Sequence, residues 1–125
     1  MIPVSLAYAG VMTLLSVLLA NQVLYVRLRG GKMPDWKAHA TERTQANFVE
    51  NVPLALVLLY LLEVAGAGAV AVHVLGSALV VLRLLHAWGM SAYAGANYPR
   101  LIGAQGTFLL LSVMGVAALY LGLAG

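Results

Sequence analysis

A set of charged and polar residues lies inside segments that are otherwise apolar. Arg43, Asn47 and Glu50 recur at spacings of four and three residues, which places them on one face of a helix. Arg83 and His86 form a second set with a spacing of three residues. The planar guanidinium of arginine binds carboxylates through two parallel hydrogen bonds, and a glutamate binds cationic groups. The excess of arginine therefore indicates an anionic ligand.

A simpler interpretation gives these charges a structural role only. Glu50 and Arg83 could pair and hold two helices together, because buried charges commonly pair. The wider set argues against that interpretation, since Arg100 adds a further arginine and Gln45 a further amide. A single stabilising pair does not require so many polar groups.

The composition shows what kind of protein must position these residues. Of the 125 residues, 62% are hydrophobic and 9% are charged, and the mean hydropathy is +0.93. Soluble domains carry roughly 25% charged residues, so a soluble globular domain and a disordered chain are both excluded. The chain has no cysteine, which excludes disulfides, thiolate metal sites and a thiol nucleophile from the protein itself.

Four segments are long and apolar enough to span a membrane as helices. They cover residues 3–27, 43–63, 68–92 and 101–123. A tight turn at 65–68 joins the second segment to the third, and 27–43 is the one hydrophilic loop. We expect an all-α, integral membrane four-helix bundle that forms a single domain over residues 1–125. Close helix packing is expected at Gly76, Gly103, Gly106, Gly115 and Gly122.

The seven basic residues are distributed unevenly along the chain. All but Arg83 and Arg100 lie between positions 27 and 43, and Arg100 lies in the third connection, on the same side. Because basic residues mark the cytoplasmic side of a membrane protein, both termini are predicted to face outward. The same rule explains the net charge of +3 without a nucleic-acid partner.

The remaining polar residues have simpler interpretations. We expect His73 to be a packed or interfacial histidine, and His39 and Glu63 to be solvated. The three histidines lack the spacing of a metal site, so no metal is predicted. The sequence also lacks a phosphate-binding glycine loop and the Gly-x-Ser-x-Gly elbow of serine hydrolases.

Three short segments carry a resemblance to a known family. Residues 42–53 (ERTQANFVENVP) hold an Arg-x-x-x-Asn-x-x-Glu pattern followed by proline, and the other two segments are 83–89 (RLLHAWG) and 99–103 (PRLIG). In these segments the sequence resembles the MAPEG family, the membrane-associated proteins of eicosanoid and glutathione metabolism. The similarity in layout covers essentially the whole chain, whose short length and compact loop are most similar to bacterial members.

The resemblance implies a homotrimer of four-helix subunits that binds glutathione as cosubstrate between neighbouring subunits. The residues that match glutathione contacts are Arg27, Arg43, Gln45, Asn47, Glu50, Arg83 and His86. Arg100 matches the catalytic arginine that stabilises the glutathione thiolate. Many relatives place a tyrosine where Met90 stands here, and Tyr93 and Tyr98 are the candidates to supply the missing hydrogen bond.

The implied function is that of a membrane-bound glutathione transferase, with glutathione peroxidase as a related activity. A guanidinium near a thiol favours the thiolate, which is the nucleophile. Lipophilic electrophiles or lipid hydroperoxides would reach the thiolate from the bilayer lipid. The implied location is a bacterial inner membrane, with the active site toward the cytoplasm.

Two other functions fit parts of the same pattern. A small proton-coupled exporter also has four spans and an intramembrane glutamate, but its glutamate lies in the first span, which here has no acidic residue. A glutathione-binding membrane protein without catalytic activity is suggested by Met90. Turnover by an Arg100→Ala variant would separate an enzyme from both alternatives.

Overall fold

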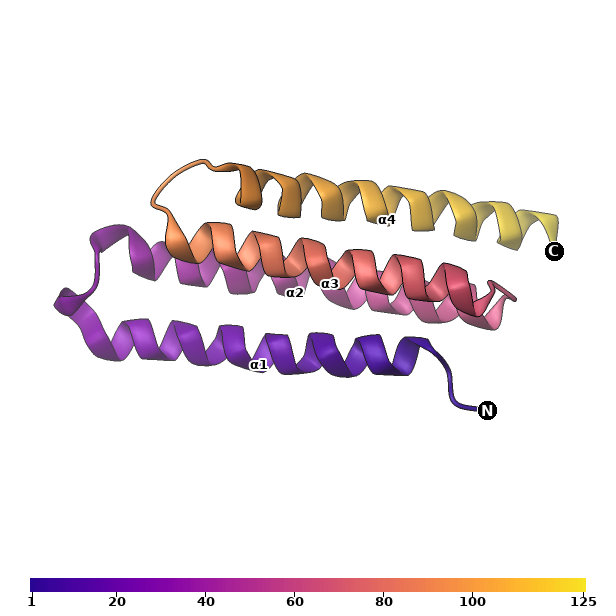
Figure 1. Ribbon diagram of the computed structural model, residues 1–125, viewed down its shortest axis with the longest axis horizontal. Helices are drawn as coiled ribbons and strands as arrows, with labels where there is room; N and C mark the ends of the chain where they lie inside the picture. Colours follow the sequence, from indigo (N-terminus) through magenta and orange to yellow (C-terminus); the bar gives the residue numbers. More distant parts are fainter.

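The computed structural model describes all residues from 1 to 125 and consists of helices only. The four long helices are α1 (Ser5–Arg29), α2 (Asp35–Val64), α3 (Ala69–Ala92) and α4 (Tyr98–Ala124), and a short 3-10 helix, η1 (Gly30–Lys32), follows α1. They run up and down along one long axis, with both termini at the same end (Figure 1). Each long helix is apolar enough to cross a membrane, so the predicted all-α four-helix bundle is confirmed.

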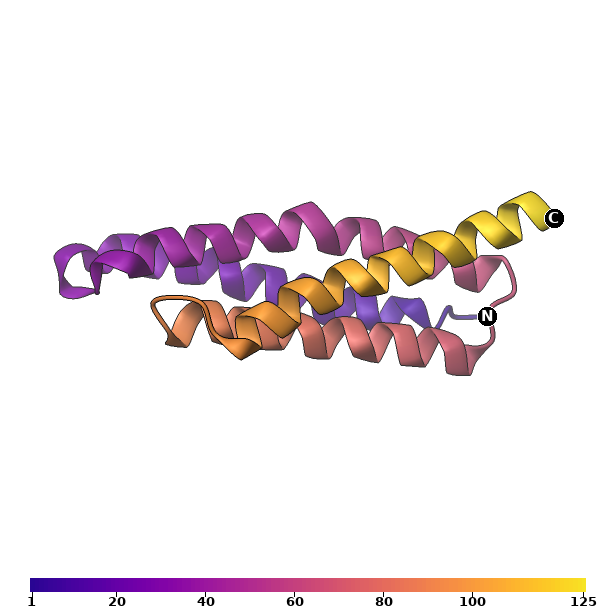
Figure 2. The ribbon, with the colours of Figure 1, turned by 90° about the horizontal axis from the view of Figure 1, so that it is seen from above.

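The hydrophilic loop predicted over 27–43 is wrong for most of its length. Helix α2 already begins at Asp35, and His39, which we expected in the loop, lies exposed on that helix. Pro34 precedes the helix and Asp35 supplies a negative charge in its first turn, where the helix dipole favours one. Figures 1 and 2 both show that the α1–α2 hairpin projects beyond the α3–α4 connection.

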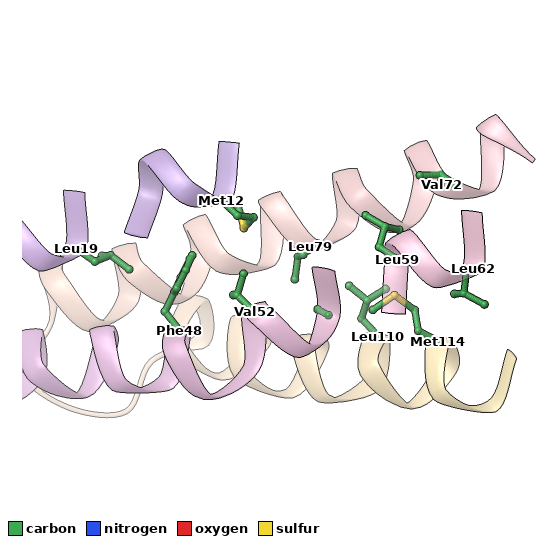
Figure 3. Packing of buried hydrophobic residues seen from close by; sticks show 11 residues of the cluster. Met12, Leu19, Phe48, Val52, Leu59, Leu62, Val72, Leu79, Leu110 and Met114 are labelled. Atoms are coloured by element: carbon green, nitrogen blue, oxygen red, sulfur yellow. The ribbon is translucent and has the colours of Figure 1, made fainter. Parts of the chain in front are cut away.

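The core lies along the inner face of α2. Its buried residues recur at alternating spacings of four and three, the pattern of a helix with one face in the core. The members of this cluster from α2 are Phe48, Val52, Ala55, Leu59 and Leu62. They pack against Met12 and Leu19 of α1, Val72 and Leu79 of α3, and Leu110 and Met114 of α4 (Figure 3). Most other large apolar side chains are exposed on the outside of the bundle, as a lipid environment permits.

Helices α3 and α4 make the most extensive contact of any pair, because glycines let their backbones approach. A Cβ atom at Gly103 would lie 2.5 Å from the backbone nitrogen of His86. Gly106 faces Leu82 in the same way, and Gly76 of α3 receives the Tyr8 ring of α1. This packing fixes the register that brings the Arg83 turn of α3 beside the middle of α4. The other predicted packing glycines, Gly115 and Gly122, face open space.

Glu63 is partly exposed, and its carboxylate also stabilises the start of α1, which we did not expect. Its carboxylate accepts hydrogen bonds from the backbone nitrogens of Val4 at 2.6 Å and Ser5 at 3.0 Å. These N–H groups have no partner within the helix, so a carboxylate there is favourable. Nearby, His73 of α3 is exposed. Its Nδ1 lies 2.6 Å from the hydroxyl of Tyr8, so the side chain is held against α1.

Candidate functional site

Arg83 lies in the interior of the bundle, with 1% of its surface exposed. Its Nη2 donates to Oδ1 of Asn47 at 2.7 Å, and its Nη1 donates to Oγ1 of Thr107 at 3.3 Å. Nη2 also lies 3.4 Å from Nδ1 of His86, and the Phe48 ring lies 5.8 Å from the guanidinium carbon. Helices α2, α3 and α4 therefore meet at this one side chain.

No carboxylate neutralises Arg83. Its hydrogen-bond partners are an amide, a hydroxyl and an imidazole, and its Nε has no partner. The Thr107 hydroxyl donates to the backbone oxygen of Gly103 at 2.6 Å, which leaves its lone pairs free to accept from Arg83. The site therefore holds a buried positive charge that neutral groups solvate.

The ion pair between Glu50 and Arg83, on which the simpler structural interpretation depended, is absent. Oε1 of Glu50 lies instead 3.8 Å from Nη1 of Arg43, and both side chains are about half exposed. The physical reason is the rotation of α2. Glu50 projects nearly opposite the face that carries Phe48 and Val52, whereas Asn47 lies between the two faces and reaches Arg83.

Helix α2 thus divides the predicted polar stripe into two parts. Asn47 belongs with Arg83, His86 and Thr107 to what we call the buried cluster. Arg43 and Glu50 form what we call the outer pair, on the surface of the single chain. Gln45 is half-buried and makes no side-chain hydrogen bond. Charged groups in a membrane span usually face a bundle interior, a cavity or a neighbouring protein. The face of α2 that carries the outer pair is therefore poorly suited to contact with lipid.

Arg27 lies at the projecting end of the α1–α2 hairpin. Its Nη2 donates to Oε1 of Glu42 at 2.9 Å, and both side chains are largely exposed. An exposed pair of this kind contributes less than about 1 kcal/mol, so little energy opposes its exchange for another carboxylate. Arg27 therefore lies near the α2 surface and can exchange Glu42 for another carboxylate.

Arg100 lies in the first turn of α4, beside an open hollow of about 510 Å³. The hollow is lined by Ala96, Asn97, Tyr98, Arg100, Leu101 and Ala104. The backbone N–H of Arg100 donates to Oδ1 of Asn97, but its guanidinium makes no hydrogen bond or ion pair. A half-buried guanidinium without an internal partner, next to apolar side chains, can bind an anion.

The tyrosine candidates lie in different places. Tyr93 follows the last residue of α3, is 48% exposed, and packs edge-on against Trp88 with ring centroids 6.2 Å apart. Met90 is buried and has no hydrogen to donate. Tyr98 is exposed and lines the hollow beside Arg100. The structure therefore brings Tyr98, and not Tyr93, to the same hollow as Arg100.

Several polar residues of this region were not identified from the sequence. Lys37 of α2 donates to the backbone oxygen of Ser91, and Gln22 of α1 donates to the Ser91 hydroxyl at 2.9 Å, which ties the end of α3 to two other helices. Thr107 gives no sequence signal, because threonine in a helix usually bonds to its own backbone. Asn97 was detectable, since asparagine followed by proline at the first turn is a helix-start signal.

Comparison with known proteins gives one match. A model of the MAPEG family matches residues 5–120, which is nearly the whole chain. Searches of curated proteins and of solved structures returned no significant match. The matched range contains the buried cluster around Arg83, the outer pair and Arg100 together.

Proposed function

The chain belongs to the MAPEG family of membrane proteins of glutathione and eicosanoid metabolism, and from this premise we propose that it is a membrane-bound glutathione transferase. A related peroxidase activity on lipid hydroperoxides is part of the proposal. The observation that carries it is the buried Arg83 charge without a carboxylate, next to an outer pair that the single chain leaves uncovered. These groups suit a ligand with a net negative charge that also carries one positive group for Glu50.

Glutathione has the complementary groups. It carries two carboxylates, one ammonium and one thiol, and it is anionic at neutral pH. Glu50 would bind the ammonium, while Arg43 and Arg27 would bind carboxylates, each exchanging a weak exposed partner for the ligand. Asn47, Arg83 and His86 would form the wall behind the ligand. Gln45 and Tyr93 remain proposed contacts from a neighbouring subunit or a moved loop.

Arg100 is the proposed catalytic residue. A free thiol has a pKa near 8.5 and is mostly protonated at neutral pH. The unpaired Arg100 guanidinium would stabilise the thiolate, whose sulfur attacks an electrophilic carbon, forms a C–S bond and expels the leaving group with its electron pair. The apolar side chains around the hollow suit a lipophilic electrophile that arrives from the bilayer.

The site requires a second copy of the chain. A charged group facing lipid costs up to about 2.5–3.5 kcal/mol at the centre of a span on insertion scales, so Arg43 and Glu50 favour a protein neighbour. We propose a homotrimer in a bacterial inner membrane, with both termini outside and the glutathione site toward the cytoplasm. The basic residues of the projecting hairpin support this orientation.

Glutathione binding to detergent-purified protein tests the function. Calorimetry measures binding, and ultraviolet difference absorbance detects thiolate formation on mixing. We expect millimolar or tighter binding with a thiolate signal that Arg100→Ala abolishes. Binding without thiolate would favour the inactive glutathione-binding protein that buried Met90 suggests. No binding at all would overturn the proposal and return attention to Glu50 as a proton-coupling residue.

A further inference from the structure

The side chain of Asn97 bridges the connection between α3 and α4. Its Nδ2 donates to the backbone oxygen of Gly89 at 3.0 Å and to that of Gly95 at 2.9 Å. Its Oδ1 accepts from the backbone N–H of Arg100 at 2.9 Å. One side chain therefore caps the start of α4 and also binds the last turn of α3.

Helices α3 and α4 are in close contact where Asn97 bridges them. A Cβ atom at Gly89 would lie 2.5 Å from Oδ1 of Asn97 and 2.8 Å from Cα of Arg100. Only glycine at this position lets the first turn of α4 rest directly on α3. The last turn of α3 is itself anchored, because Lys37 of α2 donates to the backbone oxygen of Ser91.

The Arg100 guanidinium makes no hydrogen bond or ion pair of its own. Its place in the hollow therefore depends on where the backbone of the first α4 turn sits. That backbone is bound to α3 by the Asn97 bridge, one helical turn before the contact between Gly103 and His86. No other side-chain hydrogen bond crosses between the two helices at the level of Arg100.

We propose that Asn97 is the positioning residue for Arg100. By binding Gly89 of α3 and the N–H of Arg100 at once, it fixes the distance from the guanidinium to an anion bound against α3. Preorganised donors stabilise a charge without reorganising, and a shift of about 1 Å is enough to weaken them strongly. The inference rests on the proposed function, since the anion it concerns is the glutathione thiolate.

Two substitutions separate positioning from helix capping. Asn97→Ser keeps a capping oxygen for the Arg100 N–H, because serine caps helices about as well as asparagine, but it is too short to reach Gly89. Asn97→Ala removes both functions. Ser112→Ala is the matched control, because Ser112 of the same helix bonds only to the backbone oxygen of Phe108.

The experiment titrates bound glutathione by thiolate absorbance, alongside the thermal midpoint and the glutathione Kd. We expect Asn97→Ser to melt close to the wild-type protein and to bind glutathione within about threefold. Its thiolate titration should move up by about one pH unit, and single-turnover rates should fall about tenfold at neutral pH. Ser112→Ala should match the wild type in all four measurements.

The outcomes are distinguishable. An unchanged thiolate titration in Asn97→Ser would overturn the inference. If the thermal midpoint of that variant fell at the same time, the contact between Asn97 and Gly89 would be a stabilising link between the helices only. If the wild-type protein binds no glutathione or forms no thiolate, the proposed function fails, and this inference fails with it. Asn97→Ser remains decisive even if Asn97→Ala does not fold.

Discussion

Arg83 shows how a buried charge is accommodated here by neutral groups. Its contacts with Asn47, Thr107 and the Phe48 ring replace water without cancelling the charge. A buried charge is costly unless other groups pair with it and bond to it. A charge kept in this state is consistent with a role in attracting an anion, which a fully paired arginine would fulfil less well.

Removal of the Asn47 amide should destabilise the protein. Asn47→Ala leaves Nη2 of Arg83 without its 2.7 Å acceptor, and an unsatisfied buried group costs about 1–3 kcal/mol, more when it is charged. Denaturant unfolding in detergent measures the change. The matched control is Asn51→Ala, since the Asn51 amide bonds only to a backbone oxygen one turn away. Equal losses from the two variants would contradict the importance of the Arg83 contact.

Substitution of Glu50 should affect binding but not stability. Its 3.8 Å contact with Arg43 is exposed on the single chain, and such pairs contribute less than about 1 kcal/mol. Glu50→Gln removes the group proposed to bind the glutathione ammonium, so affinity should fall about tenfold, or roughly 1.4 kcal/mol. Calorimetry and thermal melts of the ligand-free protein measure the two effects. A variant with unchanged affinity would remove Glu50 from the site.

The sequence predicted the residue types at the site better than their partners. The spacing of Asn47 and Glu50 places both on α2, but it does not tell which one faces α3. That depends on which face of α2 the core residues occupy, and apolar residues such as Phe48, Val49 and Val52 surround Glu50 on several sides of the helix. Thr107 was missed as an Arg83 partner because no local pattern distinguishes it from other threonines in membrane helices.

At the scale of the elements, helix existence was predictable and one helix start was not. Long apolar segments defined the four helices, because a membrane requires such lengths. The residues from Asp35 to Glu42 are mostly polar and were interpreted as loop, yet they contain no glycine or proline and continue α2 beyond its apolar part. The polar residues of this segment show where the apolar part of α2 stops, but the helix itself continues through them.

The tight contact between α3 and α4 should be sensitive to one added methyl group. Gly103→Ala would put a Cβ atom 2.5 Å from the His86 backbone nitrogen, so the helices must separate, at a cost of about 1–3 kcal/mol. Gly115→Ala is the control in the same helix, because nothing lies within 4 Å of its added Cβ. Thermal unfolding should rank Gly103→Ala well below Gly115→Ala. The reverse order would show that the two helices are not closely packed at Gly103.

At the scale of the whole molecule, the outer surface of the chain is not uniformly apolar. Large apolar side chains cover its outside, as in any membrane bundle, but the outer pair of Arg43 and Glu50 interrupts them. Gln45 and Glu50 also project from opposite sides of α2, so one small ligand cannot contact both within one subunit. A site that uses both residues must combine two copies of the chain.

Mixed oligomers test this arrangement directly. Gln45→Ala and Glu50→Gln should each weaken glutathione binding when expressed alone. When the two are co-expressed, a subunit that lacks Gln45 can still offer Glu50 to a neighbour that retains Gln45, so some sites in each mixed oligomer should regain wild-type affinity. Calorimetry on the mixed protein, isolated with two different affinity tags, measures the restored fraction. Co-expression of either variant with the double variant is the control and should restore no site, because neither combination can assemble both residues. If the mixed oligomers bind no better than the single variants, Gln45 and Glu50 do not act together across subunits, and the exposed Arg43–Glu50 pair must have another partner.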